Sequence, residues 1–136
     1  MKVYLSGRMS DGPVLRDVAR RLRAEGVTIT SSWLRQRAAT PDSTSACARI
    51  GLRDLSDVKA ADVVVALMDR PAHNGGREGE IGAALAWGKK LFVVKNVCQR
   101  NVFTALATQH FTEWESVIAA LTGERTDARR RTTAAR

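Results

Sequence analysis

Two carboxylates and one phenol are the residues of this chain best suited to chemistry. Glu80 stands in a run of small residues, with Gly79 before it and Gly82 shortly after it. Asp54 lies upstream, and Tyr4 is close to the N-terminus. Two carboxylates beside a hydroxyl can cleave a glycosidic bond, because one attacks the anomeric carbon while the other moves the proton of the leaving group. The residue types therefore predict an active site in which Glu80, Asp54 and Tyr4 are catalytic.

Glu80 is expected where a glycine-rich turn follows a buried strand and opens a helix. The strand is predicted over residues 62–67, which are almost wholly apolar, and the helix over about residues 78–88. Loops in this position bind ligands in open α/β sheets, and Gly76 and Gly79 are candidate substrate-binding residues. The small side chains around Glu80 should leave room for a ligand; they belong to Gly79, Gly82, Ala83 and Ala84. A helix N-terminus also favours negative charge. We therefore expect Glu80 to be ionised and nucleophilic, although a plain helix-start acid would show the same pattern.

Asp54 is expected on a helix over about residues 46–60. It lies four residues from both Ile50 and Val58, so helical periodicity puts it on their inward, apolar face. An ion pair with Arg53 or Lys59 at the edge of that face is the alternative interpretation. The sequence leaves the two interpretations of Asp54 open.

Strands and helices alternate along the chain. Strands are predicted over residues 3–6, 27–30, 62–67, 91–94 and 109–112, and helices over about 13–25, 46–60, 78–88 and 113–121. Such alternation predicts a parallel sheet covered on both faces, and right-handed crossovers bring the ends of the first and third strands to one edge. The loops after Ser6 and Leu67 should then face one another. Tyr4 lies on the first strand, where a packed core ring is a competing interpretation.

Composition predicts one domain followed by a basic tail. At 136 residues with 44% hydrophobic content, the chain is expected to form a single domain over residues 1–122. The first residues begin a strand at once, so we expect neither a secretory signal nor a membrane segment. Residues 123–136 carry five arginines against two acidic residues and are expected to be disordered. Cys47 and Cys98 fit no metal-ligand spacing, which favours free thiols and a cytoplasmic location.

The net charge of +8 raises the question of nucleic-acid binding. Outside the tail, however, the basic residues are spread over many predicted surfaces. Aromatic and basic residues do not interleave as a base-stacking platform requires. We therefore expect a small-molecule partner, and neither nucleic acid nor a membrane.

Several segments, taken in their order and spacing, resemble one enzyme family. They are Tyr4-Leu5-Ser6-Gly7, Arg53-Asp54-Leu55 followed by the run over residues 61–66, Gly79-Glu80-Ile81-Gly82 and Gly88-Lys89-Lys90. Over about residues 2–121 the chain resembles the nucleoside 2-deoxyribosyltransferases, and equally the related 2'-deoxynucleoside 5'-phosphate N-hydrolases. The resemblance implies a flavodoxin-like (Rossmann-like) α/β fold, a three-layer sandwich with a parallel sheet of about five strands.

The resemblance also implies a role for each candidate residue. Glu80 would be the nucleophile that forms a deoxyribosyl-enzyme, Asp54 would handle the proton of the departing base, and Tyr4 would hold the nucleophile in place. Members are typically homodimers or larger, because a polar residue of a neighbouring subunit completes each sugar site. Asn101 or Thr104 falls where that residue is expected. A carboxylate nucleophile and a proton donor suffice for this chemistry, so we expect no metal and no other cofactor.

The substrate could be a nucleoside or its 5'-monophosphate. A phosphate needs backbone amides, hydroxyls or basic side chains, which could come from Gly7, Arg8 and Ser10 in the first loop and from Arg77 in the second. Arg8, however, stands where the hydrolases usually place a serine. We therefore favour the transferase, with the hydrolase and a non-catalytic nucleotide-binding module as alternatives. The choice of base would depend on the polar loop over about residues 31–45.

Overall fold

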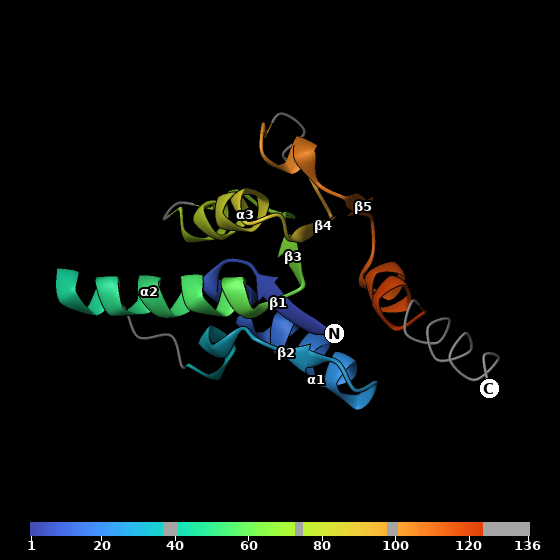
Figure 1. The fold of residues 1–136 in the computed structure, drawn as a ribbon, viewed down its shortest axis with the longest axis horizontal. Coiled ribbons are helices and arrows are strands. Elements are labelled where there is room, and N and C mark those ends of the chain that lie inside the picture. Colours follow the sequence, from blue (N-terminus) through green and yellow to red (C-terminus); the bar gives the residue numbers. More distant parts are fainter. Residues whose placement is uncertain (37–40, 73–74, 98–100, 124–136) are drawn as a thin grey trace.

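The centre of the computed structural model is a parallel sheet of five strands in the order β2-β1-β3-β4-β5 (Figure 1). The structure describes residues 1–36, 41–72, 75–97 and 101–123. Its strands are β1 (Lys2–Ser6), β2 (Thr28–Ile29), β3 (Val63–Leu67), β4 (Lys90–Val94) and β5 (Gln109–Phe111). The predicted α/β class with five parallel strands is confirmed. Apart from Gly123, the predicted tail lies outside the described residues, and so does Cys98.

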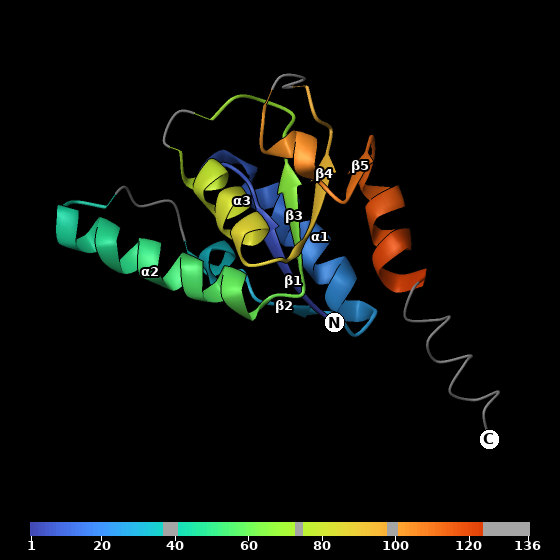
Figure 2. The ribbon, with the colours of Figure 1, turned by 45° about the horizontal axis from the view of Figure 1, so that its top comes forward.

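Helices cover both faces of the sheet and complete a three-layer sandwich (Figure 2). On one face, α2 (Thr44–Ala60) and α3 (Gly76–Ala86) pack against each other. On the other face, α1 (Gly12–Ala24) lies beside a helix over residues 114–123, and the two are joined by an ion pair of 2.7 Å between Arg21 and Glu115. The connections contain three short 3-10 turns, η1 (Met9–Asp11), η2 (Ser32–Arg35) and η3 (Thr104–Leu106).

The strand order reverses between β1 and β3. The chain leaves β1 for β2 on one side and returns to β3 on the other, and the β1–β3 register sets Ser6 beside Ala66. β3 is buried along its whole length, as a central parallel strand should be. In open α/β sheets, ligands bind at such a reversal, outside the carboxyl ends of the strands. The fold therefore brings the end of β1 and the loop before α3 to one place, as the sequence predicted.

The edge strand β2 is shorter than predicted, and side chains complete its pairing with β1. Only Thr28 and Ile29 pair with β1 as a strand. Beyond them, the Leu5 backbone N–H donates to Ser31 Oγ at 2.6 Å, and the Trp33 indole N–H donates to the Leu5 carbonyl at 2.9 Å. The start of the predicted polar loop is thus packed against β1, whereas residues 37–40 lie outside the described part of the chain.

α2 departs from its predicted apolar stripe. Val58 is buried, but Ile50 is only half-buried and Leu52 is 71% exposed. The N-terminal half of α2 extends past the sheet in both views, so no strand lies beneath it to form a core with its apolar side chains (Figure 1, Figure 2). The apolar stripe is therefore only partly covered at Ile50, whereas Asp54 lies on the half of α2 that reaches the body of the domain.

Candidate active site

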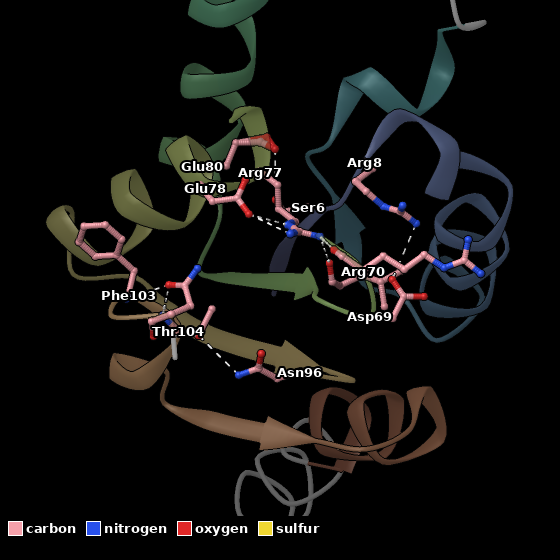
Figure 3. Close-up of polar contacts among 12 residues, drawn as sticks. Ser6, Arg8, Asp69, Arg70, Arg77, Glu78, Glu80, Asn96, Phe103 and Thr104 are labelled. Carbon is pink, nitrogen blue, oxygen red and sulfur yellow. Dashed lines mark hydrogen bonds and ion pairs between the residues drawn. The ribbon is translucent and has the colours of Figure 1, made fainter. Parts of the chain in front are cut away.

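Glu80 of α3 is buried beside two hydroxyl groups of β1, those of Tyr4 and Ser6 (Figure 3 shows Glu80 and Ser6). The Tyr4 hydroxyl donates to Glu80 Oε2 at 2.7 Å, and the Ser6 hydroxyl donates to Oε1 at 3.2 Å. Tyr4 and Ser6 are two residues apart on one strand, so their side chains point to the same face of the sheet. Both oxygens of the carboxylate are therefore held by uncharged donors from a single strand.

Burial controls the charge of Glu80 more strongly than the helix terminus does. It raises the pKa of Glu80 to about 8, and the negative charge of Asp54 adds to this rise. The hydrogen bonds from Tyr4 and Ser6 act in the opposite direction. α3 begins at Gly76, so Glu80 lies about one turn inside the helix, where the positive end has little effect. Burial, rather than the helix terminus, is therefore the largest influence on the pKa of Glu80, and the ionised nucleophile stays a prediction.

Tyr4 remains an uncharged donor throughout the neutral range. Burial is the main reason that the pKa of Tyr4 lies far above its usual value, and the nearby charge of Glu80 raises it further. The Tyr4 hydroxyl can thus donate to the carboxylate without losing its own proton.

Asp54 combines the two interpretations that the sequence left open. It is half-buried on α2, and Arg53 donates to its Oδ1 through Nη2 at 2.8 Å and through Nε at 3.1 Å. Burial raises the pKa of Asp54, although the Arg53 guanidinium opposes that rise. The charge of Asp54 also acts on Glu80. Asp54 is thus a partner of Arg53 and a neighbour of the buried carboxylate at the same time.

Arg77 is buried and binds its own chain. Its guanidinium donates to the carbonyls of Leu67 at 3.1 Å and Arg70 at 2.8 Å. It also donates to Glu78 Oε1 through Nη2 at 2.8 Å and through Nε at 3.1 Å. These bonds connect the end of β3 to the first turn of α3 (Figure 3). A phosphate-binding role for Arg77 stays a prediction, and in this structure its hydrogen bonds fix the loop that leads to Glu80.

Arg8 in the first loop faces two carboxylates. Its Nη2 lies 2.9 Å from Asp11 Oδ1, and its backbone N–H donates to Asp11 Oδ2 at 2.8 Å. Asp69, which follows β3, is 4.0 Å from the same guanidinium (Figure 3). The Asp11 side chain therefore closes the turn that begins at Arg8. Ser10 is exposed in η1, and its role in substrate binding stays a prediction, as does that of Arg8.

The glycines of the two loops differ in what surrounds them. A Cβ at Gly7 would lie 2.8 Å from Leu15 Cδ1 and 3.1 Å from Asp11 Oδ2, so this glycine is needed for packing. At Gly76 and Gly79 a Cβ would meet no atom within 4 Å. The substrate-binding roles of Gly7, Gly76 and Gly79 stay predictions.

Asn101 and Thr104 are engaged within their own turn. Asn101 Oδ1 accepts from the backbone N–H groups of Phe103 at 2.9 Å and Thr104 at 3.1 Å. The Thr104 hydroxyl, which is buried, donates to the Asn101 carbonyl at 3.2 Å (Figure 3). Phe103, between them, is 50% exposed. Completion of a neighbouring site by Asn101 or Thr104 stays a prediction.

Ser6 is the contact of Glu80 that sequence reasoning did not single out. The available signal was its spacing, because the second residue after Tyr4 on a strand must face the same way. A serine in a buried strand is most simply a small core residue, so the spacing alone did not distinguish it.

A protein-family model matches residues 3–116, which include every strand and the surroundings of Glu80. Its members are enzymes that cleave N-glycosidic bonds, a reaction for which paired carboxylates are suited. The chain belongs to this family, the nucleoside 2-deoxyribosyltransferases. The family resemblance seen in the sequence is thus confirmed.

Solved structures share the fold at low sequence identity. A 2-deoxyribosyltransferase from Bacillus psychrosaccharolyticus superposes with a TM-score of 0.69 at 20% identity, over 87% of this chain and 90% of that one. A conserved protein from Enterococcus faecalis V583 gives 0.70 at 16% identity, over 92% and 98%. The Clostridium botulinum CMP N-glycosidase BcmB gives 0.57 at 19% identity, over 89% and 98%. No curated protein matches the sequence.

Within the part of the chain that the structure describes, no helix combines the length and the apolar character needed to cross a membrane. Among the same residues, no group of three or more histidine, cysteine or acidic side chains is placed to hold a metal ion.

Proposed function

We propose that this enzyme transfers the sugar of a 2'-deoxynucleoside from one base to another through a covalent intermediate on Glu80. The observation that carries the proposal is the carboxylate at the strand reversal, buried and held by the hydroxyls of Tyr4 and Ser6. A carboxylate with uncharged partners keeps more of its reactivity than one in an ion pair. Nothing but the substrate is needed to complete the chemistry.

The reaction proceeds in two balanced steps. In the first, ionised Glu80 attacks C1' of the sugar, the C1'–N bond breaks, and its electron pair leaves with the base, which takes a proton from Asp54. In the second, a nitrogen of the incoming base attacks C1', the ester to Glu80 breaks, and the incoming base gives its proton to Asp54. Burial raises the pKa of Asp54, and a shift in this direction favours a proton donor.

The charges around the first loop support an unphosphorylated substrate. Arg8 is bound by Asp11 and lies 4.0 Å from Asp69, so the local charge is negative. Arg77 is bound to Glu78 and to backbone carbonyls. A 5'-phosphate would have to displace these carboxylates to reach either arginine, whereas a 5'-hydroxyl needs no cation.

We further propose that the enzyme acts as a homodimer or a larger homo-oligomer. The segment around η3 presents apolar side chains to solvent, with Val102 71%, Phe103 50% and Leu106 65% exposed. Contact between copies would cover them and bring Asn101 or Thr104 to a neighbouring site. Analytical ultracentrifugation tests the association, and a monomer that turns over substrate at full rate would contradict it.

The decisive experiment follows the products from a panel of deoxynucleosides and their 5'-monophosphates, each with and without a second free base. A new nucleoside that forms only when the acceptor base is present is the expected result. Free base and deoxyribose 5-phosphate, formed at a rate that the acceptor does not change, would instead establish a nucleotide N-hydrolase. Binding without release of base from any substrate would establish a non-catalytic module.

A further inference from the structure

The two oxygens of Glu80 are held unequally. The bond from Tyr4 to Oε2 measures 2.7 Å, which is typical of a strong O–H···O bond. The bond from Ser6 to Oε1 measures 3.2 Å, which is long for this type. Ser6 is fully buried, so solvent does not compete for its hydroxyl. Oε1 is therefore oriented by a fixed donor while more of its electron density remains available than on Oε2.

The charged surroundings make these hydroxyls important to the ionised form of Glu80. The titratable groups that face it are Tyr4 from β1, Asp54 from α2 and Glu78 from α3. The two acidic ones disfavour a further negative charge, and the arginines beside them are paired with these same acids. Hydrogen bonds from Tyr4 and Ser6 are thus the interactions in this set that favour the carboxylate.

We propose that Ser6 is a positioning residue for the reaction of Glu80, and that Oε1, the oxygen it holds, is the one that attacks the sugar. One lone pair of Oε1 accepts the Ser6 proton, and another is directed at C1'. When the C1'–Oε1 bond forms, the glycosidic electron pair leaves with the base, and Tyr4 keeps its bond to Oε2. When the second base attacks, the C1'–Oε1 pair returns to Oε1, where the Ser6 hydroxyl stabilises the charge. This inference rests on the proposed function.

Ser6→Ala tests the proposal against Ser31→Ala as a matched control. Ser31 is also a buried serine that hydrogen-bonds beside β1, but its partner is the Leu5 backbone N–H and not Glu80. The pH dependence of kcat/KM reports the ionisation of groups in the free enzyme. Because a hydrogen bond to a charged group is lost, we expect Ser6→Ala to move the acid limb upward by about one pH unit. Ser31→Ala should lower the melting temperature without moving that limb.

A second readout concerns the covalent intermediate. Loss of the Ser6 hydroxyl slows the step in which charge returns to Oε1, so the deoxyribosyl-enzyme should accumulate in Ser6→Ala during turnover. Intact-mass spectrometry of quenched samples measures its fraction. In the Ser31→Ala control this fraction should equal that of the wild type.

The outcomes separate this inference from the proposed function. If the wild type releases no base, the proposed function fails. If the wild type is active and Ser6→Ala shows neither the shifted limb nor the accumulated intermediate, the role of Ser6 fails alone. Should Ser6→Ala not fold, Ser6→Cys keeps a similar volume with a weaker donor. It should show a smaller shift in the same direction, and an unshifted limb in that variant would overturn the role.

Discussion

Glu78 and Glu80 lie two residues apart on α3, yet they differ in burial and in the charge of their hydrogen-bond partners. Glu78 is about one-third exposed and is bound by the guanidinium of Arg77. Glu80 is buried and receives hydrogen bonds from two uncharged hydroxyls. A carboxylate neutralised by a cation is stable and unreactive, whereas one that is buried without a cation has a raised pKa and a reactive anion. The comparison shows that the partner decides the character of each acid: Glu78 is bound by the adjacent Arg77, whereas the partners of Glu80 come from the distant strand β1.

The largest effect should come from changing each acid in turn to its amide. Glu80→Gln removes the nucleophile, so sugar transfer should fall by at least about 10³-fold. Glu78→Gln retains the shape of its side chain away from the reacting atoms, so activity should stay within about threefold of the wild type. Initial rates of base release measure both variants. Equal losses of activity in the two variants would contradict the assignment of Glu80 as the reactive acid and Glu78 as the structural one.

A smaller loss is expected for the proton donor. Asp54→Asn keeps the size of the side chain but cannot donate a proton, so turnover of natural nucleosides should fall by about 10²-fold. Substrates whose base leaves without protonation should lose much less, because the donor is not needed for them. The ratio of kcat/KM between the two substrate types measures this, and an equal loss for both would contradict the role of Asp54.

Arg77 should matter to stability more than to chemistry. Arg77→Ala leaves Glu78 and the carbonyls of Leu67 and Arg70 without their buried donor, so the free energy of unfolding should fall by about 3 kcal/mol. Arg20→Ala, which breaks the exposed pair with Asp17, should cost less than about 1 kcal/mol. Urea denaturation compares the two variants. A similar small cost for both would mean that the Arg77 bonds contribute little.

The raised pKa of Glu80 also predicts a dependence on pH. The anion is the nucleophile, so kcat/KM should rise about tenfold per pH unit until the pH reaches about 8. Stability should move in the other direction, because the folded state holds a proton on Glu80 that the unfolded chain releases. Between about pH 4.5 and about pH 8, the free energy of unfolding should therefore fall as the pH rises. Glu80→Gln should lack this component of the pH dependence.

The alternation of strands and helices was sufficient to predict the parallel sheet, whereas the meeting of Tyr4 with Glu80 was implied by the family resemblance. Their hydroxyl and carboxylate lie 2.7 Å apart although the residues are 76 positions apart in the chain. Right-handed crossovers allow few other arrangements of five such strands, which explains this success.

The charge state of Glu80 could not be predicted from the sequence. From the sequence, we expected the helix N-terminus to control the charge of Glu80. In the structure, burial is the largest cause of its shifted pKa. The hydrogen bonds of the Arg77 guanidinium could not be predicted from the sequence for a similar reason. Its carbonyl partners Leu67 and Arg70 belong to a backbone conformation that side-chain types do not specify.

The side chains that complete the edge of β1 also bear on how the protein behaves at high concentration. Beyond the two residues of β2, the N–H and carbonyl of Leu5 would otherwise be open to a strand from another molecule. Ser31 and Trp33 occupy both groups, so that stretch of backbone cannot template intermolecular β-sheet growth. The strand that carries Tyr4 and Ser6 can therefore lie next to a very short edge strand without making the enzyme prone to aggregate there.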